Sequence, residues 1–497
     1  MHAQPNTTLE VLLQGVTASV KGDARIAITS IDHDSRAVRP GALFFCLRGA
    51  RADGHAFAAD AVARGAVALV VDHDLAMPAA VTQAIVADPL AALSPVAAAF
   101  FGHPSRTLTC VGVTGTNGKT TTTFLFEAIA QAAGLSYGLS GTLGAWLGGS
   151  LRHEQINTTP FADEVQRWLA LCRDEGAGGA VMEVSSHALA LHRVDDVEFD
   201  VAVLTNLTQD HLDFHGDFES YRKAKRALFL RAQGARRQPP PCAVLNLDDP
   251  EGQALAVLLP KRVTYAIENG SALLHATGVE LRADGSRFWV RALRPAPFAL
   301  RLAGPFNVSN ALAALGAACA LDIDVEAMAE GLESVHEIPG RMVALPAGDA
   351  TVYVDYAHTP DGLEKVLRAT RAVTAKTLIC VFGCGGDRDR QKRPLMGRVA
   401  QELADRVIVT TDNPRHEEPG AIIQDILAGM HAGRAEPTVI LDRTEAIDAA
   451  IRAAQPGDVV LIAGKGHENY QIVGDERRPY SDLQVVRDAI REHSPCR

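Results

Sequence analysis

The sequence has little of what marks an exported or membrane-bound chain. Its 8 cysteines are scattered over 497 residues without a C-x-x-C pair, so we expect a reducing, cytoplasmic compartment. The two nearest, Cys380 and Cys384, are expected to be core residues at a strand-to-loop passage. The start, MHAQPNTTLE, lacks a basic end followed by an apolar run, so no signal peptide is expected. The apolar run at 89–102 is too short to span a bilayer and contains Pro95.

An excess of positive charge is also missing. The formal net charge of -11 argues against a protein whose main task is gripping nucleic acid, because phosphate backbones require clustered Lys and Arg. No internal repeat or low-complexity stretch stands out. The sequence therefore predicts a soluble globular protein with no nucleic acid and no membrane as partner, and it leaves room for a local basic pocket that binds a small anion.

Short apolar runs alternate with helical patterns along the whole chain. The length suggests about three domains, and the composition shifts place them at 1–105, 106–335 and 336–497. The central part reads as a mostly parallel sheet with helices on both faces, built around a phosphate-binding loop. The last part reads as a Rossmann-like, doubly wound unit. The predicted fold class is therefore α/β, with three consecutive α/β domains.

The stretch CVGVTGTNGKTTT, residues 110 to 122, resembles a phosphate-binding loop between a strand and a helix that runs to about Ala133. Gly115 and Gly118 let backbone N–H groups approach phosphate oxygens at the positive end of that helix. Lys119 can reach the outer phosphates, and the Thr120 hydroxyl can ligate Mg²⁺. The first glycine of the general pattern is replaced by Val113, which ends the preceding strand, so we interpret the loop as a variant. The alternative is a glycine-rich turn with an exposed lysine.

Two downstream segments add acidic and imidazole groups. Glu183 stands at the end of a buried apolar run, where an acid in a nucleotide-binding sheet commonly orients the metal; a solvated carboxylate is the alternative. Asp210, His211, Asp213 and His215 cluster in TNLTQDHLDFHG and could hold a second cation, although such histidines are more often packing or capping residues.

The C-terminal part contributes three segments. In VDYAHTP, Asp355 and His358 follow a strand, and Thr359 and Pro360 suit the start of the next helix. FGCGGDRDR fails as a dinucleotide motif because the third glycine position holds Arg388. Arg388 and Arg390 are then either surface charges or anion ligands.

The segment TTDNPRHEE holds an acid and a guanidinium on one rigid turn. Asp412 and Arg415 flank Asn413-Pro414, and a helix is expected from near Glu417. Such a turn can receive an ammonium and a carboxylate together, or it can be an exposed turn with an internal ion pair.

Taken together, these segments resemble the Mur ligases of peptidoglycan synthesis across essentially the whole chain. TGTNGKTTT, EVSSHAL, TNLTQDHLDFHG, NVSNALAA, GRM, DYAHTPDGL, GCGGDRD and DNPR occur in the order found in that family. The resemblance implies a first domain that binds a UDP-sugar, a central ATP-binding domain and a C-terminal domain that binds the incoming amino acid.

The resemblance also implies roles for single residues. ATP is expected at Gly115, Thr116, Asn117, Gly118, Lys119, Thr120, Thr121, Asn310, Arg341 and Asp355. Mg²⁺ is expected at Thr120 and Glu183 and, for a second ion, at His211 and Lys225. Lys119, Glu183, His211 and Lys225 are the implied catalytic group. The lysine is carbamylated in this family, which suits a cation, because a carbamate supplies an oxygen anion where an ammonium would repel the ion.

The implied substrate residues fall into two sets. A UDP-MurNAc-dipeptide is expected at His33, Ser35, Ala50, Arg51, Ala52, Asn157, Thr158, Thr159, Ser185 and Arg193. An incoming diaminopimelate is expected at Arg388, Asp412, Asn413, Pro414, Arg415, Gly464 and Glu468. The chain departs from the family pattern at Leu191, where glutamine is usual, and this puts one substrate hydrogen bond in question.

The activity implied is ATP-dependent formation of an amide through an acyl phosphate, by a cytoplasmic monomer. Two alternatives share that chemistry, a lysine-adding Mur ligase and a folylpolyglutamate-type ligase. A third, a P-loop switch that uses ATP only to change partners, leaves DNPR and GCGGDRD unexplained.

Overall fold

The computed structural model describes residues 7–49, 52–234, 241–282, 284–431 and 436–493. The chain divides into two compact units that each combine several stretches of sequence. The first holds Met1–Thr114, Gly134–Val203 and Lys223–Ala243, and the second holds Gly115–Ala133, Leu204–Arg222 and Val244–Arg497. The domain borders predicted near residues 105 and 336 stay predictions beside this division. In the described ranges no helix has both the length and the apolar character that crossing a bilayer requires.

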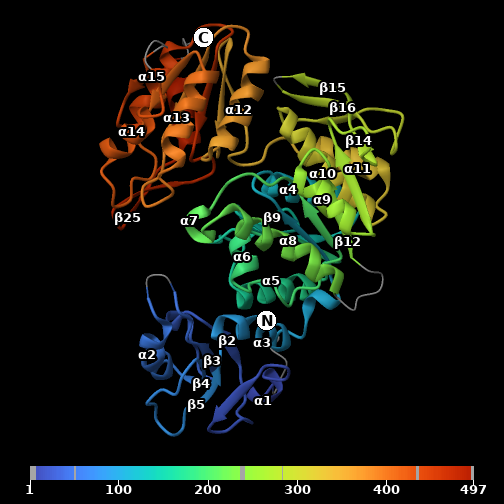
Figure 1. Cartoon of the computed structure of the whole chain (residues 1–497), viewed down its shortest axis with the longest axis vertical. Helices are drawn as coiled ribbons and strands as arrows, with labels where there is room; N and C mark the ends of the chain where they lie inside the picture. The colour runs from blue at the N-terminus through green and yellow to red at the C-terminus, as the bar shows by residue number, and fades with distance from the viewer. Residues whose placement is uncertain (1–6, 50–51, 235–240, 283, 432–435, 494–497) are drawn as a thin grey trace. The chain divides into compact units, whose positions relative to one another are not determined.

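The first unit begins with a five-stranded sheet in the order β1-β5-β4-β3-β2, parallel except for the β1–β5 pair. The elements are α1 (Leu9–Leu12), β1 (Ala18–Lys21), β2 (Ser30–Asp32), η1 (Ser35–Ala37), β3 (Ala42–Phe45), η2 (Gly54–Phe57), α2 (Ala58–Ala63), β4 (Ala66–Val71), β5 (Thr82–Val86), α3 (Pro89–Phe100) and η3 (Pro104–Arg106). Phe45 and Val70 pack with α1 and α3, whereas Phe44 and Leu69 pack with α2. Because side chains alternate along each strand, both faces of this sheet carry helices (Figure 1).

A second sheet of the first unit has the order β11-β6-β10-β7-β8-β9. Its elements are β6 (Thr109–Thr114), β7 (Tyr137–Gly141), β8 (Gly144–Leu147), β9 (Ser150–His153), α5 (Ala162–Asp174), β10 (Gly179–Glu183), α6 (Ser186–Ala190), β11 (Val201–Leu204) and α8 (Phe218–Gly234), the last two crossing the division between units. β6, β10 and β7 are parallel, as predicted, and place Glu183 opposite Val113. β7, β8 and β9 form antiparallel pairs that the apolar pattern did not indicate.

The second unit contains the helix after the glycine loop and the strands beyond residue 244. Its elements here are α4 (Lys119–Ala132), α7 (Leu212–His215), β12 (Cys242–Asn246), α9 (Pro250–Leu258), β13 (Arg262–Ala266), β14 (Leu274–His275), β15 (Thr277–Arg282), β16 (Gly285–Trp289), β17 (Phe298–Leu300), α10 (Pro305–Ala320) and α11 (Val325–Ser334). α4 ends one residue before the predicted Ala133. Strands β15, β16 and β17 form a separate antiparallel sheet.

The C-terminal part of the second unit has a six-stranded sheet in the order β18-β19-β23-β20-β21-β22, parallel except for β18. The elements are β18 (Val343–Ala347), β19 (Ala350–Asp355), α12 (Pro360–Val373), β20 (Leu378–Phe382), α13 (Lys392–Leu403), β21 (Arg406–Val409), α14 (Pro419–Leu427), β22 (Thr438–Val439), α15 (Arg443–Ala453), β23 (Val459–Ala463), β24 (Tyr470–Val473), β25 (Glu476–Pro479) and α16 (Asp482–His493).

Helices cover both faces of this sheet, which confirms the predicted doubly wound fold. α12, α13 and α14 lie side by side (Figure 1) and pack on one face through Leu363, Met396 and Ile426. α15 and α16 pack on the other through Ile447 and Val486. β23 lies between β19 and β20, so the loops after β19 and β20 diverge at a topological switch point, where ligands of such sheets usually bind.

Local sequence explains where these helices begin. The Asp88 carboxylate caps α3 by accepting from the N–H groups of Leu90 and Ala91. The Thr359 hydroxyl accepts from Gly362 N–H at 3.1 Å at the start of α12, and Pro360 follows it as predicted. α14 begins at Pro419, two residues after the predicted start.

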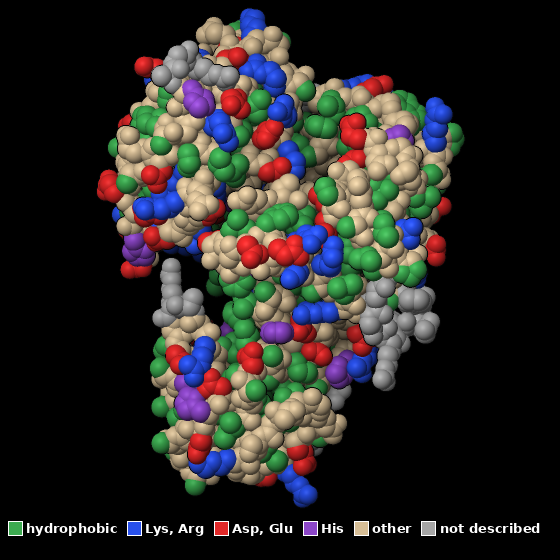
Figure 2. All heavy atoms as spheres, viewed as in Figure 1, with side chains coloured by type: hydrophobic (Ala, Val, Ile, Leu, Met, Phe, Trp, Pro, Cys, Tyr) green, Lys and Arg blue, Asp and Glu red, His purple; other side chains and the backbone are tan. Residues whose placement is uncertain are grey.

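The two cysteines that lie nearest to each other in the sequence are both in the core. Cys380 and Cys384 are buried core residues, as predicted, and burial raises the pKa of each thiol to about 12. Figure 2 shows acidic and basic side chains interspersed on the visible face. Many form exposed pairs within one helix, such as Glu364 with Arg368 in α12, which contribute little to stability.

Candidate active site

The glycine loop between β6 and α4 has a backbone that only glycine adopts easily. Gly115 has φ 152° and Gly118 has φ 87°. A Cβ added at Gly115 would overlap the Thr205 hydroxyl, and one added at Gly118 would overlap the Asn310 amide. Val113, by contrast, is fully buried inside β6. The missing first glycine is therefore a strand position, while the two remaining glycines shape the turn before α4.

Lys119 is folded back over the loop. Its Nζ donates to the carbonyl oxygens of Gly115 and Thr116, both at 2.9 Å. Lys119 is also the first residue of α4, whose first N–H groups have no acceptor within the helix. An ammonium, a helix N-terminus and the hydroxyls of Thr120 and Thr121 thus converge, and this donor set fits a polyphosphate.

The segment after β11 supports the glycine loop through hydrogen bonds. Asn206 accepts from Asn117 N–H through Oδ1 at 3.0 Å, and Thr205 Oγ1 donates to the Asn117 carbonyl at 2.6 Å. The Thr116 hydroxyl donates to the Thr208 carbonyl at 3.0 Å and lies 2.9 Å from Tyr221 Oη. Sequence reasoning missed these four supporting residues. Most of them follow directly after strand β11, and this position could have pointed to them, because the carboxyl ends of parallel strands meet at one edge of a sheet.

The three more distant residues of the predicted nucleotide set also lie in the second unit. Asn310 stands beside Gly118, with its Nδ2 donating to Asn307 Oδ1 at 3.1 Å. Arg341 Nη2 donates to Thr120 Oγ1 at 3.0 Å, and its guanidinium lies 4.8 Å from the Tyr356 ring centroid. These contacts bring Asn310 and Arg341 to the loop.

Asp355 stands at the end of β19 and is almost fully buried. Its carboxylate accepts from Met342 N–H at 2.8 Å and from Ala357 N–H at 2.7 Å, and burial raises its pKa above the ordinary value. Asp355 therefore ties the GRM motif, through Met342, to the DYAHTP motif, through Ala357.

In the first unit, Glu183 ends β10 opposite Val113, two residues before Gly115 in the chain. The side chain is buried, and its carboxylate accepts from Thr142 N–H at 2.8 Å and from Thr142 Oγ1 at 3.2 Å. The solvated-carboxylate alternative is thereby excluded. A buried, hydrogen-bonded carboxylate at this strand end has the donor chemistry that Mg²⁺ prefers.

Several residues of the predicted dipeptide set surround Glu183. Thr158 Oγ1 lies 3.1 Å from Thr142 Oγ1, and Thr159 Oγ1 donates to the Glu183 carbonyl at 2.8 Å. Ser185 N–H donates to Thr159 Oγ1 at 3.0 Å, and Arg193 Nη1 donates to the Thr159 carbonyl at 2.8 Å. The structure thus gathers Thr158, Thr159, Ser185 and Arg193 around one strand end, whereas Asn157 makes none of these contacts.

Arg193 retains donor capacity. It is buried, stacks 4.3 Å from the Phe161 ring centroid, and its Nε has no hydrogen-bond partner within the described ranges. A buried guanidinium N–H without an acceptor fits an anionic ligand group. Leu191 follows α6 as a half-buried residue and offers no polar side-chain atom there.

The N-terminal residues of the predicted dipeptide set are placed unevenly. His33 lies 4.5 Å from the Phe161 ring, and its Nδ1 is 3.0 Å from Asp163. Burial opposes protonation of His33, but the Asp163 carboxylate prevails and raises its pKa. Ser35 is buried in η1 and Ala52 is exposed in its loop. Ala50 and Arg51 lie outside the described residues.

The predicted magnesium ligands are divided between the units. Thr120 and His211 belong to the second unit, and Glu183 and Lys225 to the first. His211 has φ 55°, precedes α7, and places Nε2 3.4 Å from Asp210. Burial acts to raise the pKa of Asp210, but its basic neighbours outweigh burial and lower that pKa. Lys225 is buried within α8. The carbamylation of Lys225 stays a prediction.

The predicted amino-acid set forms a network in the C-terminal part. Asn413 Nδ2 donates to Glu468 Oε2 at 2.9 Å, and the fully buried Lys465 donates to Asn413 Oδ1 and to Glu468 Oε2, both at 3.0 Å. Gly464, with φ 123°, lies against the Asp412 carboxylate. Sequence reasoning missed Lys465, since a lysine in a loop is normally solvated.

Arg415 follows Pro414 in a left-handed conformation, φ 52°. Its Nη1 donates to the Gly386 carbonyl at 2.7 Å, and its backbone bonds to Ile472 and Gly474 of the β24–β25 hairpin. Burial lowers the pKa of this guanidinium. The turn is therefore held by long-range contacts, and the alternative of an exposed turn with an internal ion pair is excluded.

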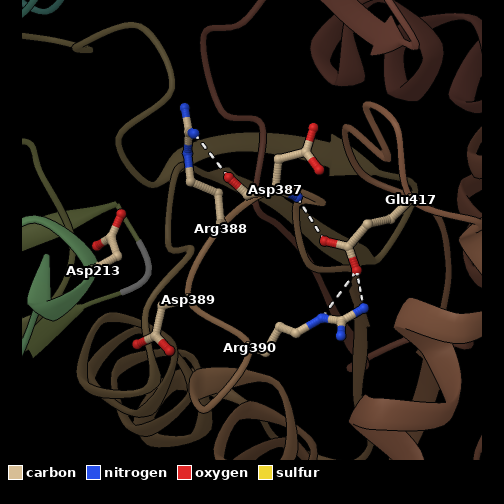
Figure 3. A pocket seen from close by; sticks show the side chains of 6 residues that line it. All are labelled: Asp213, Asp387, Arg388, Asp389, Arg390 and Glu417. Atoms are coloured by element: carbon tan, nitrogen blue, oxygen red, sulfur yellow. Dashed lines mark hydrogen bonds and ion pairs between the residues drawn. The ribbon is translucent and has the colours of Figure 1, made fainter. Parts of the chain in front are cut away.

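A pocket of about 510 Å³ lies next to this network. It is lined by Asp213, Asp387, Arg388, Asp389, Arg390 and Glu417. Figure 3 shows the Arg390 guanidinium directed at Glu417, whereas Arg388 points away and donates to the Asp387 carbonyl at 3.0 Å. Hydrogen bonds from Arg393, and then from Arg390, hold the pKa of Glu417 at about 2. Arg390 is thus occupied by an ion pair, and Arg388 is the pocket arginine that remains suited to a ligand anion.

One further group could in principle hold a metal. His55, Asp72 and His73 bring their donor atoms within 4.8 Å of one another. Arg48 Nε lies 2.6 Å from Asp72, however, and Asp53 accepts from His55 Nδ1 at 2.6 Å. These ion pairs already satisfy the cluster, which stays a structural element of the N-terminal sheet.

Family models and known proteins match this chain along most of its length. Residues 27–105 match the model "Mur ligase family, catalytic domain", residues 113–318 "Mur ligase middle domain", and residues 340–466 "Mur ligase, glutamate ligase domain". The UDP-N-acetylmuramoyl-L-alanyl-D-glutamate–2,6-diaminopimelate ligase of Gloeobacter violaceus is 47% identical over 98% of both chains. Its namesake from Syntrophomonas wolfei is 45% identical over 93% of this chain and 95% of the relative. A solved structure of a ligase with that name covers 98% of this chain and 100% of its own, with 32% identity and a TM-score of 0.66.

Proposed function

This chain belongs to the Mur ligase family, and on that premise we propose that it is the ATP-dependent ligase that adds meso-diaminopimelate to UDP-MurNAc-L-Ala-D-Glu. The amide bond joins an amine of diaminopimelate to the side-chain carboxylate of the terminal D-glutamate. The products are a UDP-MurNAc-tripeptide, ADP and phosphate, so the enzyme serves the synthesis of peptidoglycan precursors.

The observation that carries the choice of amino acid is the Asn413–Glu468 pair beside the Arg415 turn. Glu468 offers a carboxylate to an ammonium, and Arg415 offers a fork of N–H donors to a carboxylate. Diaminopimelate differs from lysine by a distal carboxylate, and a lysine-adding enzyme would gain nothing from this guanidinium. Arg388 in the neighbouring pocket and Asp412 beside Gly464 complete the proposed amino-acid site.

ATP is the phosphoryl donor in this proposal. Gly115 to Thr121 would hold its phosphates, with Lys119 beside the γ-phosphate, while Asn310, Arg341 and Asp355 would stand near the rest of the nucleotide. In support, Arg341 donates to Thr120 and Asn310 stands beside Gly118.

Two Mg²⁺ ions would be held by Thr120 with Glu183 and by His211 with a carbamylated Lys225. The donor chemistry fits where it can be judged, because Glu183 is a buried carboxylate with both oxygens hydrogen-bonded. When bound, Mg²⁺ offsets the negative charge that gathers on phosphoryl oxygens.

The reaction would run in two steps, phosphorylation of the carboxylate and then formation of the amide. An oxygen of the D-glutamate side chain attacks the γ-phosphorus, the bond to the β–γ bridging oxygen breaks, and ADP leaves an acyl phosphate behind. The amine nitrogen of diaminopimelate then attacks the carbonyl carbon, loses a proton, and the tetrahedral intermediate expels phosphate. Lys119 stabilises charge in the first step, and exclusion of water protects the acyl phosphate before the second.

The dipeptide substrate would lie along the first unit. Its peptide end would meet Asn157, Thr158, Thr159, Ser185 and Arg193, and its nucleotide-sugar would meet His33, Ser35, Ala50, Arg51 and Ala52. The unpaired Arg193 Nε supports this proposal, since it is aimed at no group of the described chain. Another group or a water would replace the hydrogen bond that Leu191 cannot make.

The decisive assay is phosphate release with UDP-muramoyl dipeptide plus either diaminopimelate or lysine. We expect release with diaminopimelate and at least ~100-fold less with lysine, because a buried site group would be left unpaired. Equal rates would contradict the choice of amino acid. Release with a folate and glutamate would favour the folylpolyglutamate alternative, and release without any amine would favour a P-loop switch.

The enzyme would work as a monomer in the cytoplasm on small-molecule substrates. The described cysteines are all free, and all but Cys319 are buried, which supports a reducing compartment. Light scattering of the purified protein tests the oligomeric state, and a dimer mass would contradict it. Fractionation of the producing cell tests the location.

A further inference from the structure

We propose that Asp361 is a positioning residue that ties the nucleotide loop to the start of α12. Its Oδ2 accepts from Asn117 Nδ2 at 2.6 Å and from Thr208 Oγ1 at 3.2 Å. Asn117 is part of the glycine loop, Thr208 belongs to the segment that supports it, and Asp361 stands 244 residues further along the chain than Asn117. The proposal rests on the nucleotide role of the loop proposed above.

Asp361 is well suited to this task. It lies in the first turn of α12, where the helix dipole favours a negative charge, and Lys365 Nζ donates to the same Oδ2 at 2.8 Å from one turn further on. A charged acceptor strengthens each hydrogen bond that it receives. One carboxylate oxygen thus gathers donors from the loop, from its supporting segment and from its own helix.

The contact completes the fixation of Asn117. The backbone N–H and carbonyl of this residue are already held by Asn206 and Thr205, and its side-chain amide is held by Asp361. The loop carries two glycines with positive φ, which lose much conformational freedom on folding. A carboxylate that anchors the residue between them lowers the entropy that remains to be lost when phosphate binds.

The same hydrogen bond connects the glycine loop, where the nucleotide is proposed to bind, to the helix α12 that packs on the C-terminal sheet. α12 follows β19, the strand that ends at Asp355, and it packs on the sheet whose loops carry the proposed amino-acid site. Because Asp361 stands in the first turn of α12, the position of that turn determines whether the side chain of Asn117 is held. Asp361 would let the part of the protein that delivers the amine organise the part that holds ATP.

The first test uses the protein without nucleotide. Hydrogen exchange is measured on peptides that cover residues 115–119 in the wild type, in Asp361→Ala and in Glu364→Ala. Glu364 is the matched control, since it pairs with Arg368 on the same helix and contacts no loop residue through that pair. We expect about tenfold faster exchange in Asp361→Ala, the loss of one charged hydrogen-bond acceptor, and no change in Glu364→Ala. Unchanged exchange in Asp361→Ala would overturn the proposal.

The second test measures binding of a non-hydrolysable ATP analogue to the same three proteins. We expect the Kd to rise about tenfold in Asp361→Ala only, with the KM for ATP rising in parallel and the KM for diaminopimelate unchanged. Asp361→Asn, which keeps the shape and loses the charge, should fall between. A general loss of folding would instead raise both KM values and lower the melting temperature, and that result would refute a positioning role.

The two tests separate two failures. Faster exchange with an unchanged Kd would mean that order in the loop does not set the affinity for the nucleotide, and would overturn the positioning role alone. No binding of the analogue to the wild type would contradict the proposed function. Thr208→Val adds a double-mutant cycle with Asp361→Ala on the same exchange readout. Effects that are fully additive would show that Thr208 and Asp361 do not act together, and would remove Thr208 from the proposal.

Discussion

The glycine loop and the amino-acid network of the C-terminal part are both built for anions and cations, yet they are held in different ways. Most partners of the loop are neutral: the Thr205 hydroxyl and the Asn206 amide hold the backbone of Asn117, and the Thr208 carbonyl accepts from the Thr116 hydroxyl. The Asp361 carboxylate adds one charged acceptor, for the side chain of Asn117. The amino-acid network is held by charge, with Lys465 fully buried against Glu468. In the proposed roles, the polyphosphate site presents an ammonium, Lys119, that bonds to loop carbonyls, whereas the site for an incoming ammonium needs an acid that is held in place.

The largest expected effect concerns the single ammonium of the loop. Replacing Lys119 by alanine removes the cation that would face the γ-phosphate, and we expect kcat to fall ~10²- to 10³-fold. Phosphate release at saturating substrates measures the change. Because the hydrogen bonds from Lys119 Nζ to the Gly115 and Thr116 carbonyls lie within the loop itself, the melting temperature should stay close to that of the wild type. A variant with nearly full activity would contradict the assignment of Lys119.

The next effect lies in the amino-acid network. Arg415→Ala should raise the KM for diaminopimelate about 100-fold, since a desolvated carboxylate would lose its charged partner, and leave the KM for ATP unchanged. Arg415→Lys should recover part of the loss, because a lysine keeps the charge without the planar fork. Arg368→Ala, on the surface of α12, is the control. An equal change in both KM values would show that the turn and not the ligand contact was damaged.

A third prediction contrasts the two kinds of support directly. Lys465→Met leaves the half-buried Glu468 without its fully buried cation, and we expect a loss of about 3 kcal/mol in the free energy of unfolding. Glu476→Ala removes one partner of an exposed pair in the β24–β25 hairpin and should change the stability by no more than about 0.5 kcal/mol. Chemical denaturation measures both. Similar values for the two variants would mean that the network is not held by its buried charge.

The last prediction concerns pH. Burial, helped by Lys392, lowers the pKa of His358 to about 4, below its value in the unfolded chain. Protonation therefore favours the unfolded state, and this group's contribution to stability is lost as the pH falls from about 6.5 towards about 4. Denaturation midpoints of wild type and His358→Gln should converge over that interval. A difference that stayed constant with pH would contradict a neutral His358 in the folded state.

Much of the fold could be predicted because it depends on local pattern. The buried strand before the glycine loop, the start of α4 at Lys119 and the cap of α12 at Thr359 follow from apolar runs and turn residues. The antiparallel strands β8, β9 and β15 to β17 were missed, because they are short and partly exposed and their apolar residues form no long run. The helix after DNPR begins at Pro419, since helix ends depend on capping contacts that pattern does not fix.

The candidate site divides in the same way. Lys119, Glu183, Asn413 and Arg415 were picked out because their residue types and their places after strands carry the chemistry. The ordered motifs also identified the family, which the full-length matches confirm. The roles of individual residues, the magnesium ions and the carbamylated lysine stay predictions.

By itself the sequence determined the α/β class, the phosphate-binding loop and the chemical types available at each strand end, because φ preferences, periodicity and charge are properties of neighbouring residues. Only the tertiary structure decided which of those groups meet. Asn117 donates a hydrogen bond to Asp361, which lies 244 residues further along the chain. Lys465 is fully buried and donates instead to Asn413 and Glu468. Such contacts depend on how strands and helices pack, and a buried donor or acceptor takes whichever partner that packing brings within about 3 Å.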